Sequence, residues 1–352
     1  MVLEPVSSLV LDEAGAFDAA LVIDDPALFA HLAGEGVPMS GFFDDVRDED
    51  TARGVAGGTV LESLEGLGEG TPRTVLWRLP RAVAAVEEIA QRVALVPGVR
   101  VFGGGRDKHL TRGMNEVLAR SFGEVSASLG RQKCRVLRAS APAPSGVTYP
   151  ERARIGELDL DLVVHGGVFG GVRLDQGTRL LLSELPDGSG AALDLACGSG
   201  LIACTMARRG WTVTASDVSA VATWSAAATA EANGLAVDVR RADGVPAPHD
   251  GRTPEPPVHP TDMAIGRAGP GVRDAYDLIA CNPPFHKGAT KDSSVAFELI
   301  EAAGAALRPG GELWVVFNSH LPYLPALREH VGSTRIVTRD RAYTVTCSKA
   351  RA

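Results

Sequence analysis

The eleven residues LDLACGSGLIA, at positions 193–203, decide the fold class of this chain. LDLAC is short and apolar, as a buried strand is, CGSG is a tight glycine turn, and LIA begins a helix. Glycines let the backbone come close to a ligand, and the N-terminus of a helix favours negative charge. The stretch therefore predicts a strand, a ligand-binding loop and a helix of an α/β domain.

Strands and helices alternate along the rest of the second half of the chain. Five segments are expected to be strands, at 191–197, 211–217, 236–243, 276–282 and 312–318. Helical patterns follow the first, second and fourth of them, and residues 334–350 predict two strands about a tight Arg-Asp turn. This alternation predicts a mostly parallel sheet with helices on both faces and an antiparallel hairpin at its C-terminal end.

The first half of the chain echoes the second across a linker. Residues 139–154 are rich in Pro, Ala and Ser and lack apolar periodicity, so a domain boundary is expected near residue 145. Earlier segments resemble the fourth strand, the fifth strand and the terminal hairpin of the second half, in that order, at 75–83, 99–110 and 123–140. We therefore expect two tandem Rossmann-like α/β domains, 1–145 and 146–352, each with a C-terminal hairpin. The first is degenerate, because no glycine-rich loop precedes these elements.

The composition argues against several classes of protein. The chain of 352 residues has a net charge of −8, no run of 18 or more apolar residues, and no Lys or Arg among its first 25 residues. A transmembrane segment and a secretory signal are therefore not expected. The five cysteines are scattered without a C-x-x-C pair, which indicates neither a disulfide framework nor a zinc site and suits a reducing cytoplasm. Residues 244–275 are dense in Pro and Gly and predict a long loop that is either functional or disordered, of which we favour disorder.

Charge is unevenly distributed along the chain. Residues 1–71 contain 15 acidic and 2 basic residues, a net charge of −13, whereas residues 72–138 contain 5 acidic and 13 basic residues, a net charge of +8. Such a basic block can bind the phosphates of a nucleic acid, or it can be a solvated face whose cations pair with the acidic segment. Six basic residues near two predicted turns or strands are candidate RNA contacts: Arg106, Lys108, Arg112, Arg131, Lys133 and Arg135.

The glycine loop is compatible with two kinds of cofactor. Gly198 to Ala203 satisfies the G-x-G-x-x-G/A dinucleotide pattern, and Asp217 lies 19 residues after Gly198, where it could accept from ribose hydroxyls. NAD and FAD stay open on this pattern alone. Asp194, just before the loop, would suit an ammonium group better than a pyrophosphate, and S-adenosylmethionine carries such a group. We therefore favour S-adenosylmethionine and place an NAD-linked oxidoreductase last.

The second informative stretch is NPPF, at 282–285, directly after the fourth strand of the second half. Proline has no N–H to donate to a sheet, so the strand ends there, at the edge where α/β proteins bind ligands. An exocyclic amine on an aromatic ring is a poor nucleophile, because its lone pair is delocalised. The side-chain oxygen of Asn282 and the carbonyl of Pro283 could accept its hydrogens, and Phe285 could stack on a base. The alternative is a simple proline turn.

At these motifs the sequence resembles a known family. DLACGSG, ASD in the second strand, RRAD after the third and NPPF after the fourth resemble class I S-adenosylmethionine-dependent methyltransferases. GGVFGGVRLDQGTRLLLSELP at 166–186, NPPFHKG and NSHLPY look like the bacterial ribosomal RNA guanine-N2 methyltransferases. That resemblance implies a degenerate methyltransferase-like first domain joined to a catalytic second domain. The chain departs from the family pattern at Ala196, where glycine is usual, at Gly166, where proline is common, and in the 244–275 insertion.

The resemblance also implies which residues bind the cofactor S-adenosylmethionine. Seven positions are carried over: Phe169, Asp194, Ala196, Gly198, Gly200, Asp217 and Asp243. Asp194 and the loop backbone would hold the methionine part, and Phe169 would line the pocket. Asp217 would accept from the ribose hydroxyls and Asp243 from the adenine amino group. Asp217 and Asp243 could instead be ordinary acids at strand ends.

Three functions stay open beside the leading one, which is methylation of a guanine N2 amine in ribosomal RNA. NPPF and close variants also occur in methyltransferases that act on adenine N6 or on the N5 amide of protein glutamine, and a non-catalytic RNA-binding protein is the third. The basic block favours RNA over a protein substrate, and the intact Asp194, Asp217 and Asn282 argue against a loss of catalysis. The expected partner is ribosomal RNA or a ribosomal subunit, with no membrane and no metal, and the expected protein is a cytoplasmic monomer.

Overall fold

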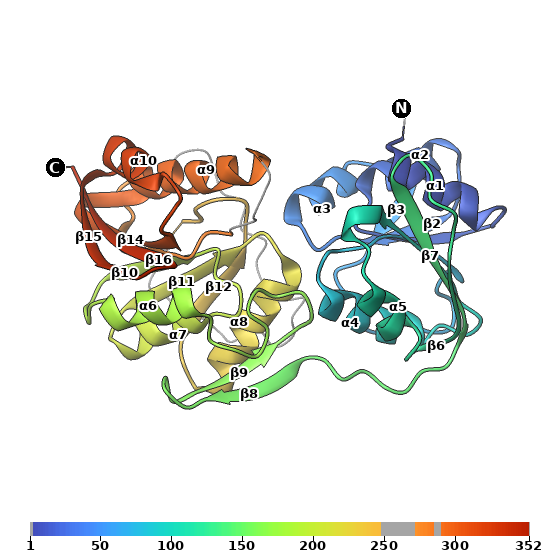
Figure 1. Cartoon of the computed structure of the whole chain (residues 1–352), viewed down its shortest axis with the longest axis horizontal. Helices are drawn as coiled ribbons and strands as arrows, with labels where there is room; N and C mark the ends of the chain where they lie inside the picture. The colour runs from blue at the N-terminus through green and yellow to red at the C-terminus, as the bar shows by residue number, and fades with distance from the viewer. Residues whose placement is uncertain (1–2, 248–271, 285–289, 352) are drawn as a thin grey trace. The chain divides into compact units, whose positions relative to one another are not determined.

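A computed structural model describes residues 3–247, 272–284 and 290–351 of the chain (Figure 1). The chain forms two compact units. The first contains Met1–Glu151 and the short segment His165–Gly167, and the second contains Arg152–Val164 and Val168–Ala352. Phe285 of the NPPF motif, and residues 248–271 of the expected 244–275 loop, lie outside the described residues.

The first unit is built on a seven-stranded sheet in the order β3-β2-β1-β4-β5-β7-β6. Its strands are β1 Ala20–Ile23, β2 Met39–Phe42, β3 Gly58–Val60, β4 Thr74–Arg78, β5 Arg100–Arg106, β6 Phe122–Ala127 and β7 Cys134–Pro142. Its helices are α1 Pro5–Ala14, α2 Pro26–Gly34, α3 Val46–Arg53, α4 Val83–Val93, the 3-10 helix η1 Asp107–His109 and α5 Arg112–Leu118. The first five strands pair in parallel, and β7 runs antiparallel to both β5 and β6.

The second unit has its own seven-stranded sheet, in the order β12-β11-β10-β13-β14-β16-β15. Its strands are β10 Ala191–Leu195, β11 Thr212–Asp217, β12 Val237–Arg241, β13 Tyr276–Cys281, β14 Leu307–Asn318, β15 Gly332–Arg339 and β16 Tyr343–Ala350. Its helices are α6 Gln176–Glu184, α7 Leu201–Arg208, α8 Ala220–Ala232, α9 Thr290–Ala306 and α10 Tyr323–His330. Before them, β8 Glu151–Ile155 and β9 Leu160–Val164 form a separate two-stranded sheet.

The two large sheets have the same topology. In each, five parallel strands lie in the order third, second, first, fourth, fifth, and an antiparallel hairpin completes the sheet beside the fifth. The segments 75–83, 99–110 and 123–140 contain the fourth strand, the fifth strand and the hairpin of the first sheet, as their resemblance to the second half predicted. The expected fold class, two α/β units with mostly parallel sheets and C-terminal hairpins, is confirmed.

The sheet of the second unit is buried on both faces. On β13, Leu278 and Ala280 belong to the core that includes α6, α7 and α8, whereas Ile279 and Cys281 belong to the core that includes α9 and α10. Figure 1 shows α9 and α10 on one side of this sheet and α6 and α7 on the other. Successive side chains of a strand point to opposite faces, so a strand that is covered on both sides reads as a continuous apolar run.

The fifth strand of the second sheet begins earlier than expected. β14 starts at Leu307 rather than near residue 312, because Leu307 already pairs with Tyr276 of β13. The next pair joins Leu278 to Glu312, so the residues between form a bulge in β14. Gly310 lies in this bulge with φ of 78°, a value that favours glycine. The Pro-Gly-Gly stretch therefore interrupts the pairing without ending the strand.

The short segment His165–Gly167 is tied to α4 of the first unit by one buried carboxylate. Glu88 accepts a hydrogen bond from the backbone N–H of Gly166 at 2.7 Å, and its other oxygen lies 2.8 Å from Nδ1 of His165. A Cβ at Gly166 would lie 2.3 Å from the carbonyl oxygen of Ala84. Glycine is therefore required at this departure from the family pattern, and proline, which has no N–H, could not make the same bond.

Candidate active site

The carboxyl edge of the second sheet brings the two informative stretches together. β10 and β13 are neighbouring parallel strands, and Leu195 pairs with Cys281. The glycine loop begins directly after Leu195, and Asn282 comes directly after Cys281, so both leave the sheet side by side. Ligands of open α/β sheets bind at this edge, and the candidate site therefore lies at the carboxyl ends of β10 and β13.

The loop after β10 has a backbone conformation that favours glycine. Gly198 and Gly200 have φ values of 52° and 79°, and Ala196 has a φ of 60° although it carries a side chain. A Cβ at Gly200 would lie 2.9 Å from Cα of Ala226, so only glycine fits against α8. A Cβ at Gly198 would meet nothing closer than 3.9 Å. The loop thus packs tightly on one side and leaves room for a ligand on the other.

Asp194 is a fully buried carboxylate with one unsatisfied oxygen. Its Oδ2 accepts a hydrogen bond from the N–H of Ala203 at 2.9 Å, while Oδ1 has no hydrogen-bond partner among the described residues. Burial raises the pKa of Asp194 to about 7, although the bond from Ala203 acts in the opposite direction. A buried carboxylate oxygen without a partner is costly, so a cationic ligand at Oδ1 would be stabilising. The site therefore fits the ammonium group that the sequence led us to expect there.

Asp217, at the end of β11, is held against the glycine loop. Its two oxygens accept hydrogen bonds from the backbone N–H groups of Gly198 and Ser219, each at 3.0 Å. A carboxylate oxygen can accept more than one hydrogen bond, so these two bonds do not by themselves use up the acceptor capacity of Asp217. Asp243 is exposed shortly after β12, which runs parallel to β11, and therefore lies at the same edge of the sheet. Phe169 is 66% exposed in the connection between β9 and α6.

Asn282 follows the last residue of β13 and is half-buried. Its Nδ2 donates a hydrogen bond to Oγ1 of Thr178 at 2.9 Å, and no described residue is hydrogen-bonded to its Oδ1. Thr178 lies in the first turn of α6 and was not among the residues predicted from the sequence. The amide oxygen is the acceptor that the expected chemistry needs, and it is the end to which no described residue is hydrogen-bonded.

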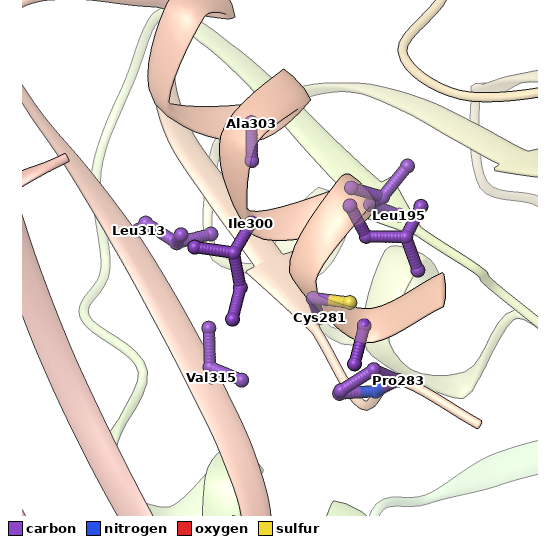
Figure 2. Close-up of a pocket in the computed structure, with 9 residues that line it drawn as sticks. Leu195, Cys281, Pro283, Ile300, Ala303, Leu313 and Val315 are labelled. Carbon is purple, nitrogen blue, oxygen red and sulfur yellow. The ribbon is translucent and has the colours of Figure 1, made fainter. Parts of the chain in front are cut away.

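Pro283 is anchored in an apolar part of the core. Figure 2 shows it around the same small pocket as the side chains of Leu195, Cys281, Ile300, Ala303, Leu313 and Val315. These side chains come from β10, β13, β14 and α9, and apart from the Cys281 thiol none carries a polar group. The buried proline ring is therefore one wall of an apolar hollow, which offers no polar partner to a ligand.

The six candidate RNA contacts divide into paired and unpaired cations. Three form ion pairs: Arg131 with Asp12, Arg135 with Asp107, and Arg112 with Glu116. Only the first of these pairs uses the acidic segment 1–71. In the part of the chain that the structure describes, no ion pair involves the other three, which are all exposed: Arg106, Lys108 and Lys133. Neutralisation by the acidic segment thus accounts for only part of the basic block.

The unpaired cations gather at the carboxyl edge of the first sheet. The backbone N–H of Asp107 donates to the carbonyl of Lys133 at 3.0 Å, so the β6–β7 turn lies next to the end of β5. Burial lowers the pKa of His109, and so do three nearby cations, those of Arg81, Lys108 and Arg106. We call the exposed cations at this place the basic edge: Arg81, Arg106, Lys108 and Lys133.

Neither a metal centre nor a membrane span is found in the described part of the chain. Within these residues, no three His, Cys, Asp or Glu side chains are grouped so that they could hold a metal ion. None of the helices there combines the length and the apolar character needed to cross a bilayer.

Comparison with known proteins relates the chain to one family. The methyltransferase small domain matches residues 159–262 and 257–347, and the RLMG N-terminal domain matches residues 53–143. Ribosomal RNA large subunit methyltransferase G of Pseudomonas fluorescens is 34% identical over 283 residues, which cover 76% of this chain and 69% of that protein. The chain belongs to the ribosomal RNA large subunit methyltransferase G family. The resemblance expected from its motifs is thereby confirmed.

Two further likenesses extend over both units of this methyltransferase G family member. The protein of the same name from Stutzerimonas stutzeri is 32% identical over 282 residues, which cover 77% of this chain and 69% of that protein. The T. thermophilus 16S rRNA N2 G1207 methyltransferase (RsmC), solved in complex with AdoMet and guanosine, is 22% identical with a TM-score of 0.77 and covers 99% of this chain and 92% of its own. At that identity the structural likeness establishes the fold alone.

Proposed function

We propose that this member of the methyltransferase G family transfers a methyl group from S-adenosylmethionine to the exocyclic N2 amine of a guanine in the RNA of the large ribosomal subunit. The names of its relatives support the reaction class and the RNA. One observation carries the chemistry. Asn282 directly follows β13, which pairs with β10, the strand that leads into the glycine loop, and no described residue is hydrogen-bonded to its amide oxygen.

The cofactor is bound by residues of the second unit. When bound, S-adenosylmethionine supplies a methyl group on a sulfonium cation, which is already a strong electrophile. Asp194 accepts from the ammonium group, for which its unsatisfied Oδ1 is available. Asp217 accepts from the ribose hydroxyls. The other contacts are Asp243 at the adenine amino group, Phe169 along the pocket, and the backbone of Ala196, Gly198 and Gly200 at the methionine part.

The target amine is activated by orientation rather than by a strong base. Oδ1 of Asn282 and the carbonyl of Pro283 accept its two hydrogens and draw them out of the plane of the guanine ring, which frees the lone pair to point out of that plane. Phe285, which lies outside the described residues, offers a face for the extruded base. As the new N–C bond formed, the methyl–sulfur bond of the cofactor would break and leave its electron pair on a neutral thioether sulfur. The methylated amine would then lose one proton to water.

The first unit holds the RNA in this proposal. Phosphate contacts from lysine and arginine position a nucleic acid without reading its sequence. The cations of the basic edge are the best placed to make them, since none of them pairs with a carboxylate among the described residues. The other three candidates, Arg112, Arg131 and Arg135, would have to exchange an ion pair for a phosphate. We propose further that the protein acts as a monomer in the cytoplasm, on ribosomal RNA or on a ribosomal subunit.

Mapping of N2-methylguanosine in ribosomal RNA by mass spectrometry tests the proposed function. RNA from cells that carry the gene should contain an N2-methylguanosine that cells without the gene lack, and the purified protein with S-adenosylmethionine should restore it. Identical maps from the two cell lines, or transfer to adenine N6 or to a protein glutamine instead, would contradict the proposal. Calorimetry adds a control for the cofactor, since tight binding of NADH without binding of S-adenosylmethionine would exclude the reaction class.

A further inference from the structure

We infer that Thr178 is a positioning residue for methyl transfer. Its hydroxyl orients the Asn282 amide so that Oδ1, and not the NH2 group, faces the target amine. This inference rests on the proposed function, because it assigns a role within the same site. Thr178 acts through Asn282 and does not itself touch the substrate.

Thr178 is held in place by the start of α6. It is the third residue of that helix, after Gln176 and Gly177, and is only 7% exposed. Asp175 caps the helix, because its Oδ1 accepts from the backbone N–H groups of Gly177 at 2.9 Å and of Thr178 at 3.1 Å. A buried residue in a capped first turn has one fixed location. The hydroxyl that Asn282 meets is therefore pre-positioned.

A second set of contacts fixes the same turn from the C-terminal hairpin. Gln176 donates to Oδ2 of Asp340 at 3.0 Å, and the other oxygen of that carboxylate accepts from the backbone N–H groups of Ala342 and Tyr343. A Cβ at Gly177 would lie 3.1 Å from the ring of Tyr343, so the helix start packs closely against the hairpin. The acid, the glutamine and the glycine of the DQGT motif thus build a rigid support, and the threonine is the member that meets the site.

The chemistry of an amide makes its orientation decisive. One end of an asparagine side chain accepts hydrogen bonds, and the other end donates two. Rotation of the Asn282 amide by half a turn would set its NH2 group against the NH2 group of the guanine, so that neither could accept from the other. A hydroxyl can donate as well as accept, and in the structure the Thr178 hydroxyl accepts from Nδ2, which leaves Oδ1 for the guanine. Valine has nearly the shape of threonine without the hydroxyl, so a valine at this position isolates the effect.

The sheet pairing gives Asn282 a counterpart in the first unit. Arg78 follows Trp77, the last residue of β4 that pairs with β1. Asn282 follows Cys281, the last residue of β13 that pairs with β10. Since β4 and β13 are the fourth strands of two sheets with the same topology, Arg78 and Asn282 hold matching positions.

At these matching positions both side chains donate to a hydroxyl on the helix that precedes the first strand of their own large sheet. Arg78 donates to Oγ of Ser7 at 2.8 Å, and Ser7 is the third residue of α1, as Thr178 is of α6. A guanidinium has only donors, so the bond in the first unit cannot serve to choose between a donor end and an acceptor end. The competing explanation for the Thr178 hydroxyl is therefore that it only supports the fold, as the Ser7 hydroxyl does. Substitution of Ser7 provides the control that separates a structural role from a positioning role.

Single-turnover methyl transfer by the full chain tests the inference. Thr178→Val should slow this step by about 10- to 100-fold, as expected for one misdirected hydrogen bond at a buried site, and should change the affinities for S-adenosylmethionine and RNA less than about twofold. Thr178→Ser should restore the rate to within about threefold of the wild type. In an Asn282→Ala background, Thr178→Val should have no further effect, because the group that it orients is gone. Ser7→Ala should lower the melting temperature without slowing transfer by the folded enzyme.

Three results would overturn the inference. The first is a wild-type transfer rate for Thr178→Val, and the second is a rate for Thr178→Ser that is as low as that of Thr178→Val. The third is a double variant in which the rate losses of Thr178→Val and Asn282→Ala multiply fully. If Thr178→Val folds poorly, Thr178→Ala is judged by the same criteria, with its rate corrected for the folded fraction. Failure of the proposed function is distinguishable from all of these, because in that case the wild-type chain itself would form no N2-methylguanosine.

Discussion

Each unit buries a carboxylate near the junction of its first central strand and the following helix, and the two carboxylates are satisfied differently. Asp25 in the first unit is 1% exposed, accepts from the Ser7 hydroxyl at 2.7 Å and forms an ion pair with Arg78 at 3.2 Å. Asp194 in the second unit has one oxygen without a partner among the described residues. The first unit thus satisfies its acid from its own residues, whereas the second leaves one carboxylate oxygen without a partner among the described residues.

The same contrast is seen at the end of the neighbouring strand. Asp217 follows Ser216, which pairs with the last residue of β10, and Phe43 follows Phe42, which pairs with the last residue of β1. Phe43 is fully buried and packs edge to face against Phe29, with ring centroids 5.5 Å apart. An aromatic ring thus stands where the second unit has the acid proposed to bind ribose. At this position the first unit therefore has a packed aromatic ring, and the second unit has a carboxylate.

The largest effect on methyl transfer is expected from removing the Asn282 side chain, which most distinguishes the carboxyl edge of the second sheet from that of the first. Asn282→Ala should lower the rate of methyl transfer by at least about 10²–10³-fold, because the target amine loses an acceptor that acts in the transition state. The affinity for S-adenosylmethionine, measured by calorimetry, should stay within about twofold, since the amide is not among its anchors. A variant with a near-wild-type rate would remove Asn282 from the chemistry.

The matched control for that prediction is Arg78→Ala in the first unit. This change breaks the ion pair with the buried Asp25 and should therefore lower the melting temperature. The rate of methyl transfer per folded molecule should not change. Equal losses of activity and of stability in Asn282→Ala and Arg78→Ala would contradict the contrast between a catalytic role for Asn282 and a structural role for Arg78.

Asp194→Asn is expected to have a smaller effect. It should weaken S-adenosylmethionine binding about 10- to 100-fold, because a hydrogen bond to a charged group contributes roughly 1.5–3 kcal/mol. The unliganded variant should be more stable than the wild type at about pH 8, since asparagine leaves no charge to bury. Asp25→Asn should do the opposite, with lower stability and unchanged cofactor affinity. Calorimetry and thermal melting on the same samples test both, and equal affinity for Asp194→Asn would place the ammonium group elsewhere.

The pKa of Asp194 makes that binding depend on pH. The folded-state pKa is raised from 3.8 to about 7, so the folded chain binds an extra proton between these values, and its stability without ligand falls as the pH rises through this window. A cationic ligand prefers the ionised acid, so S-adenosylmethionine affinity should rise from about pH 5.5 to about pH 7.5. Asp194→Asn should give a flat profile, and a flat wild-type profile would exclude Asp194 as the partner.

The smallest effect is expected at the basic edge. Replacing Arg106, Lys108 and Lys133 together with glutamine should weaken RNA binding about tenfold and reduce the salt slope by about 2, since each phosphate contact contributes about 0.7–0.9 to that slope. Cofactor affinity should not change. Arg131→Gln is the matched control: its charge is already paired with Asp12, so it should affect RNA affinity less. Unchanged RNA binding by the triple variant across a salt series would refute the docking role.

The second unit is the more predictable of the two because its parallel strands are buried on both faces. DLIAC and ELWVVF read as continuous apolar runs for that reason. The strands near the start of the first unit are shorter, with four residues in β1, four in β2 and three in β3. None of the three residues of β3 is buried, so this edge leaves little apolar pattern to recognise.

Motifs in the sequence identify residues whose roles depend on close neighbours, such as the glycine loop and the turn at Asn282. They do not identify Thr178, whose partner Asn282 is 104 residues away and is brought to it only by the fold. The basic block shows the same limit, because Arg131 pairs with Asp12 across 119 residues. Counting charges along the chain cannot tell which cations are paired in this way.

The return of the chain to the first unit at His165–Gly167 bears on how the protein can be cut into pieces. A cut near residue 151 would deprive Glu88 of two of its partners, because the N–H of Gly166 and the ring of His165 would leave with the other fragment. A cut after Gly167 would instead take β8 and β9 away from the second unit. No single cleavage yields two complete units. When the two fragments are produced separately, at least one of them therefore lacks part of its own structure, and its measured activity would reflect that loss.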